Sequence, residues 1–173
     1  PNSKFLILKR NPAAILHSMI NTWDGGRLDY KHLLKYKRDF LNAPHLIHSF
    51  SRNNLVKEIQ YESLVNQPDE TISEICDFLE LEYKETLLSI SHNESISGDF
   101  GDDAYKRDRR DDYTMKPITS SVDNWKSNLY RTNTGKFILG YLHHLGEDFL
   151  KEYGYSLDVD IKASPSREFN HFI

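Results

Sequence analysis

The sequence has 173 residues, about the length of one domain and enough to bury a hydrophobic core without disulfides or metals. Its 22 Lys and Arg against 26 Asp and Glu give a formal net charge of -4, which argues against a protein that coats nucleic acid by electrostatic attraction. No apolar run approaches the about 20 residues that a membrane-spanning helix needs. A single cysteine, Cys76, permits neither an internal disulfide nor a cysteine-based zinc site. We therefore expect a cytoplasmic protein with no nucleic-acid partner, no metal and no membrane span.

The chain opens with a predicted strand and helix. Residues 4–9 form an apolar run that predicts a strand buried on both faces, as in parallel sheets. Asn11 and Pro12 follow as an N-cap and a first-turn proline, and apolar positions at helical spacing continue until Gly25 and Gly26. A buried strand so early in the sequence implies neighbouring strands that these residues do not supply.

The middle of the chain predicts two more helices and a second strand. A helix is predicted over residues 28–41 that ends near Pro44, and residues 55–61 predict the second strand. Because the segment between the two strands is long enough for a helical crossover, we expect them to pair in parallel. After Pro68, apolar residues spaced i, i+3, i+4 and i+7 predict a helix whose Cys76 packs into the core.

The C-terminal part is predicted to be helical after a charged loop. Residues 91–116 are crowded with charges and predict a mobile loop, and residues 121–125 predict a helix start. One long helix is predicted from residue 134 to residue 153, with Gly154 as its C-cap. We therefore expect one domain over residues 1–155 and a short, polar, frayed tail over residues 156–173.

Three short motifs have simple structural interpretations. Residues 133–136 spell the end of a phosphate-binding P-loop, but Tyr130 stands where the motif needs glycine and no strand precedes it, which favours a helix start. His143 and His144 are sequential, so they diverge by about 100° around a helix and suit a surface better than a metal site. Residues 99–101 spell a kinase magnesium motif without its companion motifs, which favours chance.

One pair of residues points to ligand binding. Arg10 leaves the end of the first strand, and open parallel sheets bind ligands beyond the carboxyl ends of their strands. Ser18 follows eight residues later on the predicted helix. A guanidinium beside the first amides of a helix, with a hydroxyl further along, favours a phosphate. The alternative is a surface arginine with a serine facing the core, and the spacing alone leaves both open.

Three segments in the expected order resemble the sulfotransferases that use 3′-phosphoadenosine 5′-phosphosulfate (PAPS). Residues 5–18 are similar to the segment that binds the 3′-phosphate: an apolar strand, Arg-Asn-Pro, and a serine at the same eight-residue offset. Residues 59–79 are similar to the family's Tyr-Glu-x-Leu-Val, Pro and Asp-Phe-Leu pattern, and residues 115–126 to its late loop and tryptophan. Residues 17–20 are most similar to the tyrosylprotein sulfotransferase branch and its bacterial relatives.

This resemblance implies an α/β fold like that of P-loop NTPases, a parallel sheet flanked by helices, of which this chain carries the C-terminal part. It implies that Arg10 and Ser18 bind the 3′-phosphate and that Tyr61 contacts the nucleotide. Lys116 becomes a candidate for completing the anion site. Three arginines are candidates beside it, although a solvated run of charges explains them equally well: Arg107, Arg109 and Arg110. We expect Trp125 to anchor helix packing.

The sequence also departs from the family pattern. The loop that holds the 5′-phosphosulfate and the catalytic base are expected upstream of Pro1, so the catalytic residues stay unknown and the chain alone is expected to be inactive. Thr22 stands where the tyrosylprotein branch has a basic residue four positions after the serine. The lone cysteine also lacks that branch's luminal disulfide pattern. These departures favour a bacterial or otherwise intracellular relative.

The implied reaction is transfer of a sulfuryl group from PAPS to a hydroxyl or amine acceptor, without a metal. The acceptor is not specified, because acceptor pockets form from variable loops, here residues 24–54 and 91–112. Other interpretations remain open: a non-catalytic nucleotide-binding or scaffold domain of the same fold, a fragment that needs a partner chain, or a kinase on a related fold.

Overall fold

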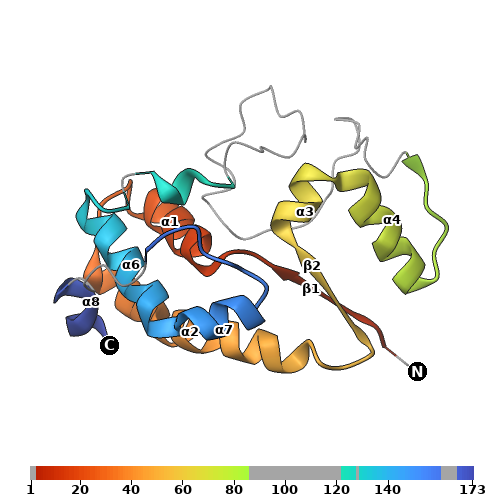
Figure 1. The fold of residues 1–173 in the computed structure, drawn as a ribbon, viewed down its shortest axis with the longest axis horizontal. Coiled ribbons are helices and arrows are strands. Elements are labelled where there is room, and N and C mark those ends of the chain that lie inside the picture. Colours follow the sequence, from red (N-terminus) through yellow and green to blue (C-terminus); the bar gives the residue numbers. More distant parts are fainter. Residues whose placement is uncertain (1–2, 86–121, 128, 161–166) are drawn as a thin grey trace.

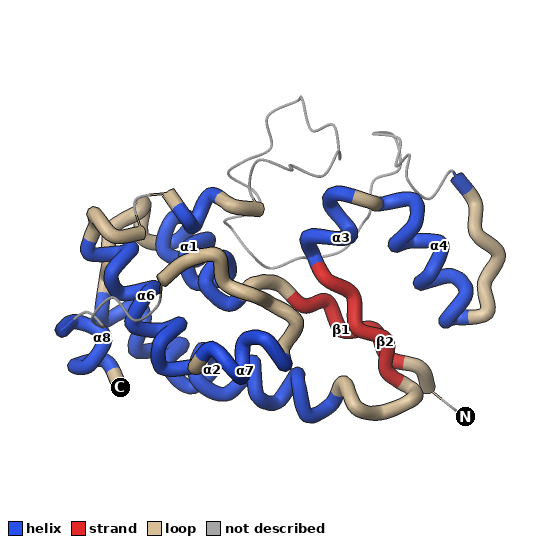
Figure 2. Tube along the Cα trace, in the orientation of Figure 1, coloured by secondary structure: helices blue, strands red, loops and turns tan. Residues whose placement is uncertain are grey.

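The structure is a computed structural model that describes residues 3–85, 122–127, 129–160 and 167–173 (Figures 1 and 2). Helices α1, α2, α6, α7 and α8 gather on one side of a small sheet, and α3 and α4 lie on the other side. The elements in chain order are β1 (Phe5–Lys9), α1 (Pro12–Trp23), α2 (Tyr30–Phe50), β2 (Val56–Gln60), α3 (Tyr61–Asn66), α4 (Pro68–Leu79), the 3₁₀ turn η3 (Asn124–Lys126), α6 (Asn133–Leu145), α7 (Glu147–Glu152) and α8 (Arg167–Phe172). The protein is therefore an α/β structure.

The two strands pair in parallel, which confirms the predicted crossover. Phe5 lies opposite Val56 at one end of the ladder, and Lys9 lies opposite Gln60 at the other. Helices α1 and α2 form the connection, as parallel neighbours require. The second strand is one residue shorter than predicted at each end, and Tyr61 is already the first residue of α3.

Most apolar side chains of β1 are exposed, and their predicted burial depends on neighbouring strands that these residues do not supply. Among the described residues nothing covers most of its apolar side chains, and Phe5, Leu6 and Leu8 are 57%, 42% and 54% exposed. The buried residue of the strand is instead Lys9, which is 3% exposed. A continuous apolar run indicates a strand that is suited to burial, and other segments have to pack on it to cover its side chains.

Helix α1 begins and ends as predicted. The Asn11 side chain caps it by accepting a hydrogen bond of 2.9 Å from the Ala13 amide, and Pro12 occupies its first position. After Trp23 the chain turns through Gly25 and Gly26, whose φ angles of 60° and 81° lie in the left-handed region that suits glycine.

Helix α2 runs to Phe50, through the proline at which the sequence predicted its end. Pro44 has no amide hydrogen, so it cannot donate to the carbonyl of Phe40 one turn earlier. The Tyr141 hydroxyl of α6 donates a hydrogen bond of 2.8 Å to that carbonyl instead. The helix continues because a distant side chain satisfies the acceptor that the proline leaves open.

Helix α6 lies at the centre of the hydrophobic core. Thr132 caps its N-terminus by accepting a hydrogen bond of 3.0 Å from the Gly135 amide, which confirms residues 133–136 as a helix start. The predicted helix over residues 134–153 is in fact two helices, because Gly146 adopts a φ of 84° and interrupts it. Gly154, with a φ of 96°, follows α7 as predicted for a C-cap glycine.

The predicted frayed tail is wrong for residues 167–173, which include α8. Phe169 and Phe172 are 1% and 4% exposed and pack against Phe137 of α6 with ring centroids 5.2 Å apart. The polar composition of this stretch conceals two aromatic residues that lie on one helical face.

The structure also tests the predicted burial or exposure of several single residues. Cys76 is buried on α4, as predicted, and His143 and His144 are exposed on α6. The predicted helix start over residues 121–125 is a single 3₁₀ turn in the described part, in which the predicted packing residue Trp125 is 3% exposed. No helix within the described ranges combines the length and the apolar character needed to cross a membrane.

Candidate functional site

Arg10 and Tyr61 meet at the carboxyl ends of the two strands. Lys9 and Gln60 are paired in the ladder, so the residues that follow them leave the sheet side by side. The guanidinium carbon of Arg10 lies 4.4 Å from the centroid of the Tyr61 ring. Such stacking restrains the guanidinium plane while its N–H groups remain at the edge of the plane. The parallel register therefore brings together two of the predicted site residues.

Ser18 lies beside Arg10 in one hollow along α1. The hollow has a volume of about 130 Å³, well above the about 30 Å³ that one water occupies in the liquid. It is smaller than the about 300–1,000 Å³ of pockets that enclose drug-sized ligands, so it suits an anionic group better than a whole nucleotide. Residues from one face of α1 line it together with Arg10 and η3: Ala14, His17, Ser18, Asn21, Thr22, Asn124 and Trp125.

The first amides of α1 contribute less than the sequence suggested. Pro12 has no N–H, and the Ala13 amide donates to the side chain of Asn11. An anion in the hollow would therefore depend on side chains along α1 more than on its N-terminal amides.

His17 is a lining residue that the sequence interpretation passed over. Burial, and then the nearby cation of Arg10, lower the pKa of His17 below its usual 6.5. The side-chain nitrogen of Asn21 lies 3.1 Å from both ring nitrogens, so the amide packs against the imidazole. The sequence does contain a signal for this residue: His17 follows Ala14 by three positions and precedes Ser18 by one, which places it near the same face of the predicted helix.

Glu62 and Tyr155 hold the strand ends together. One carboxylate oxygen of Glu62 accepts a hydrogen bond of 3.2 Å from the Asn11 amide, and the other accepts one of 2.8 Å from the Tyr155 hydroxyl. Burial and the Glu62 carboxylate raise the pKa of Tyr155, while Arg10 acts in the opposite direction. Glu62 thus links the segment after β1 to α3. In the sequence, the signal for a role of Glu62 is its position directly after Tyr61 in the Tyr-Glu-x-Leu-Val pattern.

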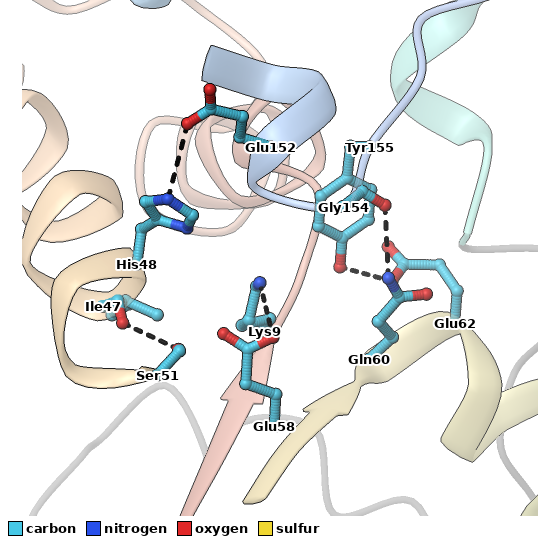
Figure 3. A network of polar contacts seen from close by, with 10 residues as sticks. All are labelled: Lys9, Ile47, His48, Ser51, Glu58, Gln60, Glu62, Glu152, Gly154 and Tyr155. Carbon is cyan, nitrogen blue, oxygen red and sulfur yellow. Dashed lines mark hydrogen bonds and ion pairs between the residues drawn. The ribbon is translucent and has the colours of Figure 1, made fainter. Parts of the chain in front are cut away.

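A second set of polar contacts lies between the end of α2 and the contact of Glu62 with Tyr155 (Figure 3). The ammonium of Lys9 lies 2.9 Å from a carboxylate oxygen of Glu58 and 4.4 Å from the centroid of the Tyr153 ring. Burial raises the pKa of Glu58, but hydrogen bonds from Ser51 and Lys9 outweigh it and leave that pKa below its usual value. This network joins β1 and β2 to the end of α2 and to α7, and so supports the residue from which Arg10 extends.

The structure places three of the four predicted binding residues close to one another. Arg10 and Ser18 line the hollow, and Tyr61 contacts Arg10. Lys116 lies outside the described residues. So do the three arginines of the charged segment (Arg107, Arg109 and Arg110) and the whole segment 91–116.

Chemically, the arrangement can bind an anion. It offers a permanent cation, a hydroxyl and an imidazole along one hollow. Within the described ranges, no three His, Cys, Asp or Glu side chains gather where they could hold a metal ion.

Comparisons with known proteins agree with the resemblance that the motifs indicate. Residues 1–85 match the model of the sulfotransferase family. Over 146 residues the chain is 27% identical to a Caenorhabditis briggsae protein named "Putative protein-tyrosine sulfotransferase". The alignment includes 76% of this chain and 48% of that relative, so the chain spans about half the length of that protein. No solved structure shows a significant match.

Proposed function

We propose, from the match of residues 1–85 to the sulfotransferase family model, that the chain binds the 3′-phosphate of PAPS, the donor that this family generally uses, at Arg10 and Ser18. The observation that carries the proposal is that these two side chains line one anion-sized hollow. Their roles follow from their chemistry, because Arg10 offers a fork of charged donors and Ser18 a single hydroxyl donor.

The stacking of Arg10 on Tyr61 supports the same assignment. An arginine held at its plane by an aromatic ring loses less freedom when it binds, so more of the interaction with phosphate appears as affinity. We assign Tyr61 to the nucleotide site on this basis. Lys116 remains a proposed further anion contact.

In the proposed reaction, an acceptor oxygen or nitrogen attacks the sulfur of PAPS. The bond between sulfur and the bridging phosphate oxygen breaks, the sulfuryl group moves to the acceptor, and the acceptor loses a proton. The leaving group is 3′,5′-adenosine bisphosphate. Arg10 and Ser18 hold a phosphate that does not react, so that binding energy from this remote group positions the sulfur. The name of the C. briggsae relative makes a tyrosine hydroxyl one acceptor to test.

The test is binding of 3′,5′-adenosine bisphosphate to the 173-residue chain, measured by calorimetry. We expect Arg10→Ala to weaken binding about tenfold or more, because a hydrogen bond to a charged group contributes about 1.5–3 kcal/mol. Arg38→Ala is the matched control, since Arg38 is exposed on α2, an element that contributes no residue to the hollow.

Adenosine 5′-phosphate identifies which phosphate is involved. It lacks the 3′-phosphate, so its weaker binding should be insensitive to Arg10→Ala. If neither Arg10→Ala nor Ser18→Ala changes the affinity for the bisphosphate, the assignment of the 3′-phosphate site is wrong. Absence of binding by the unaltered chain would instead favour a scaffold, and stronger binding of ATP a kinase.

A further inference from the structure

We propose that His17 is a second anion contact in the hollow and that it takes up a proton when the 3′-phosphate binds. The proposal rests on the proposed function, because it assigns a further residue to the same site. In effect, the affinity of the site for its nucleotide would depend on pH through one histidine.

The position of His17 carries the first step. His17 lines the hollow together with Arg10 and Ser18, and it lies one residue before Ser18 on α1. A phosphate that contacts both the guanidinium and the hydroxyl is then within the same small cavity as the imidazole. A protonated imidazole has two N–H donors, so one can reach a phosphate oxygen.

Asn21 lies against the imidazole in the free protein. Its side-chain nitrogen is 3.1 Å from both ring nitrogens of His17. The same side chain carries a carbonyl oxygen, and a half-turn of the amide would present this acceptor to an N–H of an imidazolium.

The charges around the hollow carry the second step. Thr22, one helical turn after Ser18, also lines the hollow, and its side chain carries no charge. Both η3 and α6 pack against α1. On η3, the ammonium of Lys126 lies 3.0 Å from a carboxylate oxygen of Asp123. Helix α6 contributes apolar residues to the shared hydrophobic core, and its His143 and His144 are exposed. Glu62 of α3 accepts from Asn11 and Tyr155. Of the charged groups named, Arg10 is the one that also lines the hollow.

The sign of the effect follows from these charges. In the free protein burial and Arg10 lower the pKa of His17. A bound phosphate brings about −1.5 to −2 charges, which exceeds the single charge of Arg10 and favours the imidazolium. Between the lowered free pKa and the raised bound pKa, binding takes up a proton. Affinity should therefore gain as the pH falls through that window, by about tenfold for each unit that separates the two pKa values.

The experiment compares three forms of the chain from about pH 5 to about pH 8, the range in which histidine titrates. Binding of 3′,5′-adenosine bisphosphate is measured for the unaltered chain, for His17→Gln, and for His143→Gln as the exposed control. Titration of the ligand's own phosphate, near about pH 6, affects all three equally. We expect the affinity ratio of the unaltered chain to His17→Gln to approach one at the alkaline end and to reach about tenfold at the acid end.

A second measurement needs no substitution. Calorimetry of the unaltered chain in buffers with different heats of ionisation counts the protons taken up, and we expect uptake beyond that of the ligand. An affinity ratio that stays constant with pH, or uptake explained by the ligand alone, would overturn the role of His17 and leave the Arg10 site intact. Absence of bisphosphate binding at every pH would overturn both proposals.

Discussion

Lys9 shows how a single residue at the end of β1 depends on its partners. Its side chain is 3% exposed and pairs with Glu58, which is about a third exposed. A charge removed from water in this way needs a compensating charge or hydrogen bond. The ammonium also lies above the Tyr153 ring, where burial and Glu58 raise the pKa of the phenol to about 12. Lys9 thus connects the strand that precedes Arg10 both to β2, through Glu58, and to the end of α7, through Tyr153.

Glu58→Gln should lower the free energy of unfolding by about 1–3 kcal/mol at neutral pH, because it leaves the Lys9 ammonium without its carboxylate. The double variant Lys9→Met/Glu58→Gln should recover part of that loss, since no buried charge remains. Urea denaturation measures both. Glu74→Gln is the control, because Glu74 pairs with Lys57 at the surface and should contribute less than about 1 kcal/mol.

The pH dependence of this effect has a definite sign. The pKa of Glu58 is lowered in the folded state, so its stabilising contribution is complete above the usual value of 4.5 and is lost as the pH falls through the lowered pKa. The difference between the unaltered chain and Glu58→Gln should therefore shrink in acid. A difference that stays constant down to about pH 3 would contradict the ionic origin of the contribution.

At the scale of elements, α2 continues past Pro44 because α6 supplies the missing hydrogen bond. The Phe40 carbonyl accepts from the Tyr141 hydroxyl, and this contact is buried. Burial raises the pKa of Tyr141, so its hydroxyl remains protonated and donates throughout the physiological range. The two helices are consequently coupled at one carbonyl group.

Tyr141→Phe should destabilise the protein by about 1–3 kcal/mol, because it leaves the Phe40 carbonyl buried without a donor. In a Pro44→Ala background the same change should cost less, since the amide that alanine restores at this position can donate to that carbonyl within the helix. A double-mutant cycle by urea denaturation measures the difference. Equal costs in both backgrounds would show that the proline and the tyrosine act independently.

At the scale of the whole molecule, α8 joins the end of the described chain to the central helix. Gly140 of α6 permits the approach, because a Cβ built there would lie 2.6 Å from the Cβ of Phe169. No side chain fits without displacing α8, since real Cβ contacts are not that short. Lys37 of α2 adds a hydrogen bond of 2.9 Å from its ammonium to the Ile173 carbonyl.

Gly140→Ala should destabilise the protein by about 1–3 kcal/mol, although alanine has the higher helix propensity by about 1 kcal/mol. Hydrogen exchange should also become faster in residues 167–173. Combined with Phe169→Ala, which removes the contact, Gly140→Ala should lose most of its cost. If hydrogen exchange in residues 167–173 does not change in Gly140→Ala, the close packing is not what holds α8.

Much of the candidate site could be predicted from residues that are neighbours along the chain. Asn11 and Pro12 start α1, and the eight-residue offset places Ser18 on the face that continues from Arg10. The parallel register then follows from the crossover and brings Tyr61 beside Arg10. His17 escaped notice because its burial and its distance from Arg10 depend on the packing of α1 in three dimensions.

The sequence by itself determined the local structure: where α1 starts, which face of α4 is apolar, that the strands run parallel, and which motif carries the family resemblance. Tertiary structure alone decided that α2 passes Pro44 and that Phe169 docks beside Gly140. Caps, turns and helical faces depend on residues a few positions apart. Satisfaction of a buried carbonyl or coverage of an apolar face depends on segments far apart in sequence, which meet only when the chain has folded.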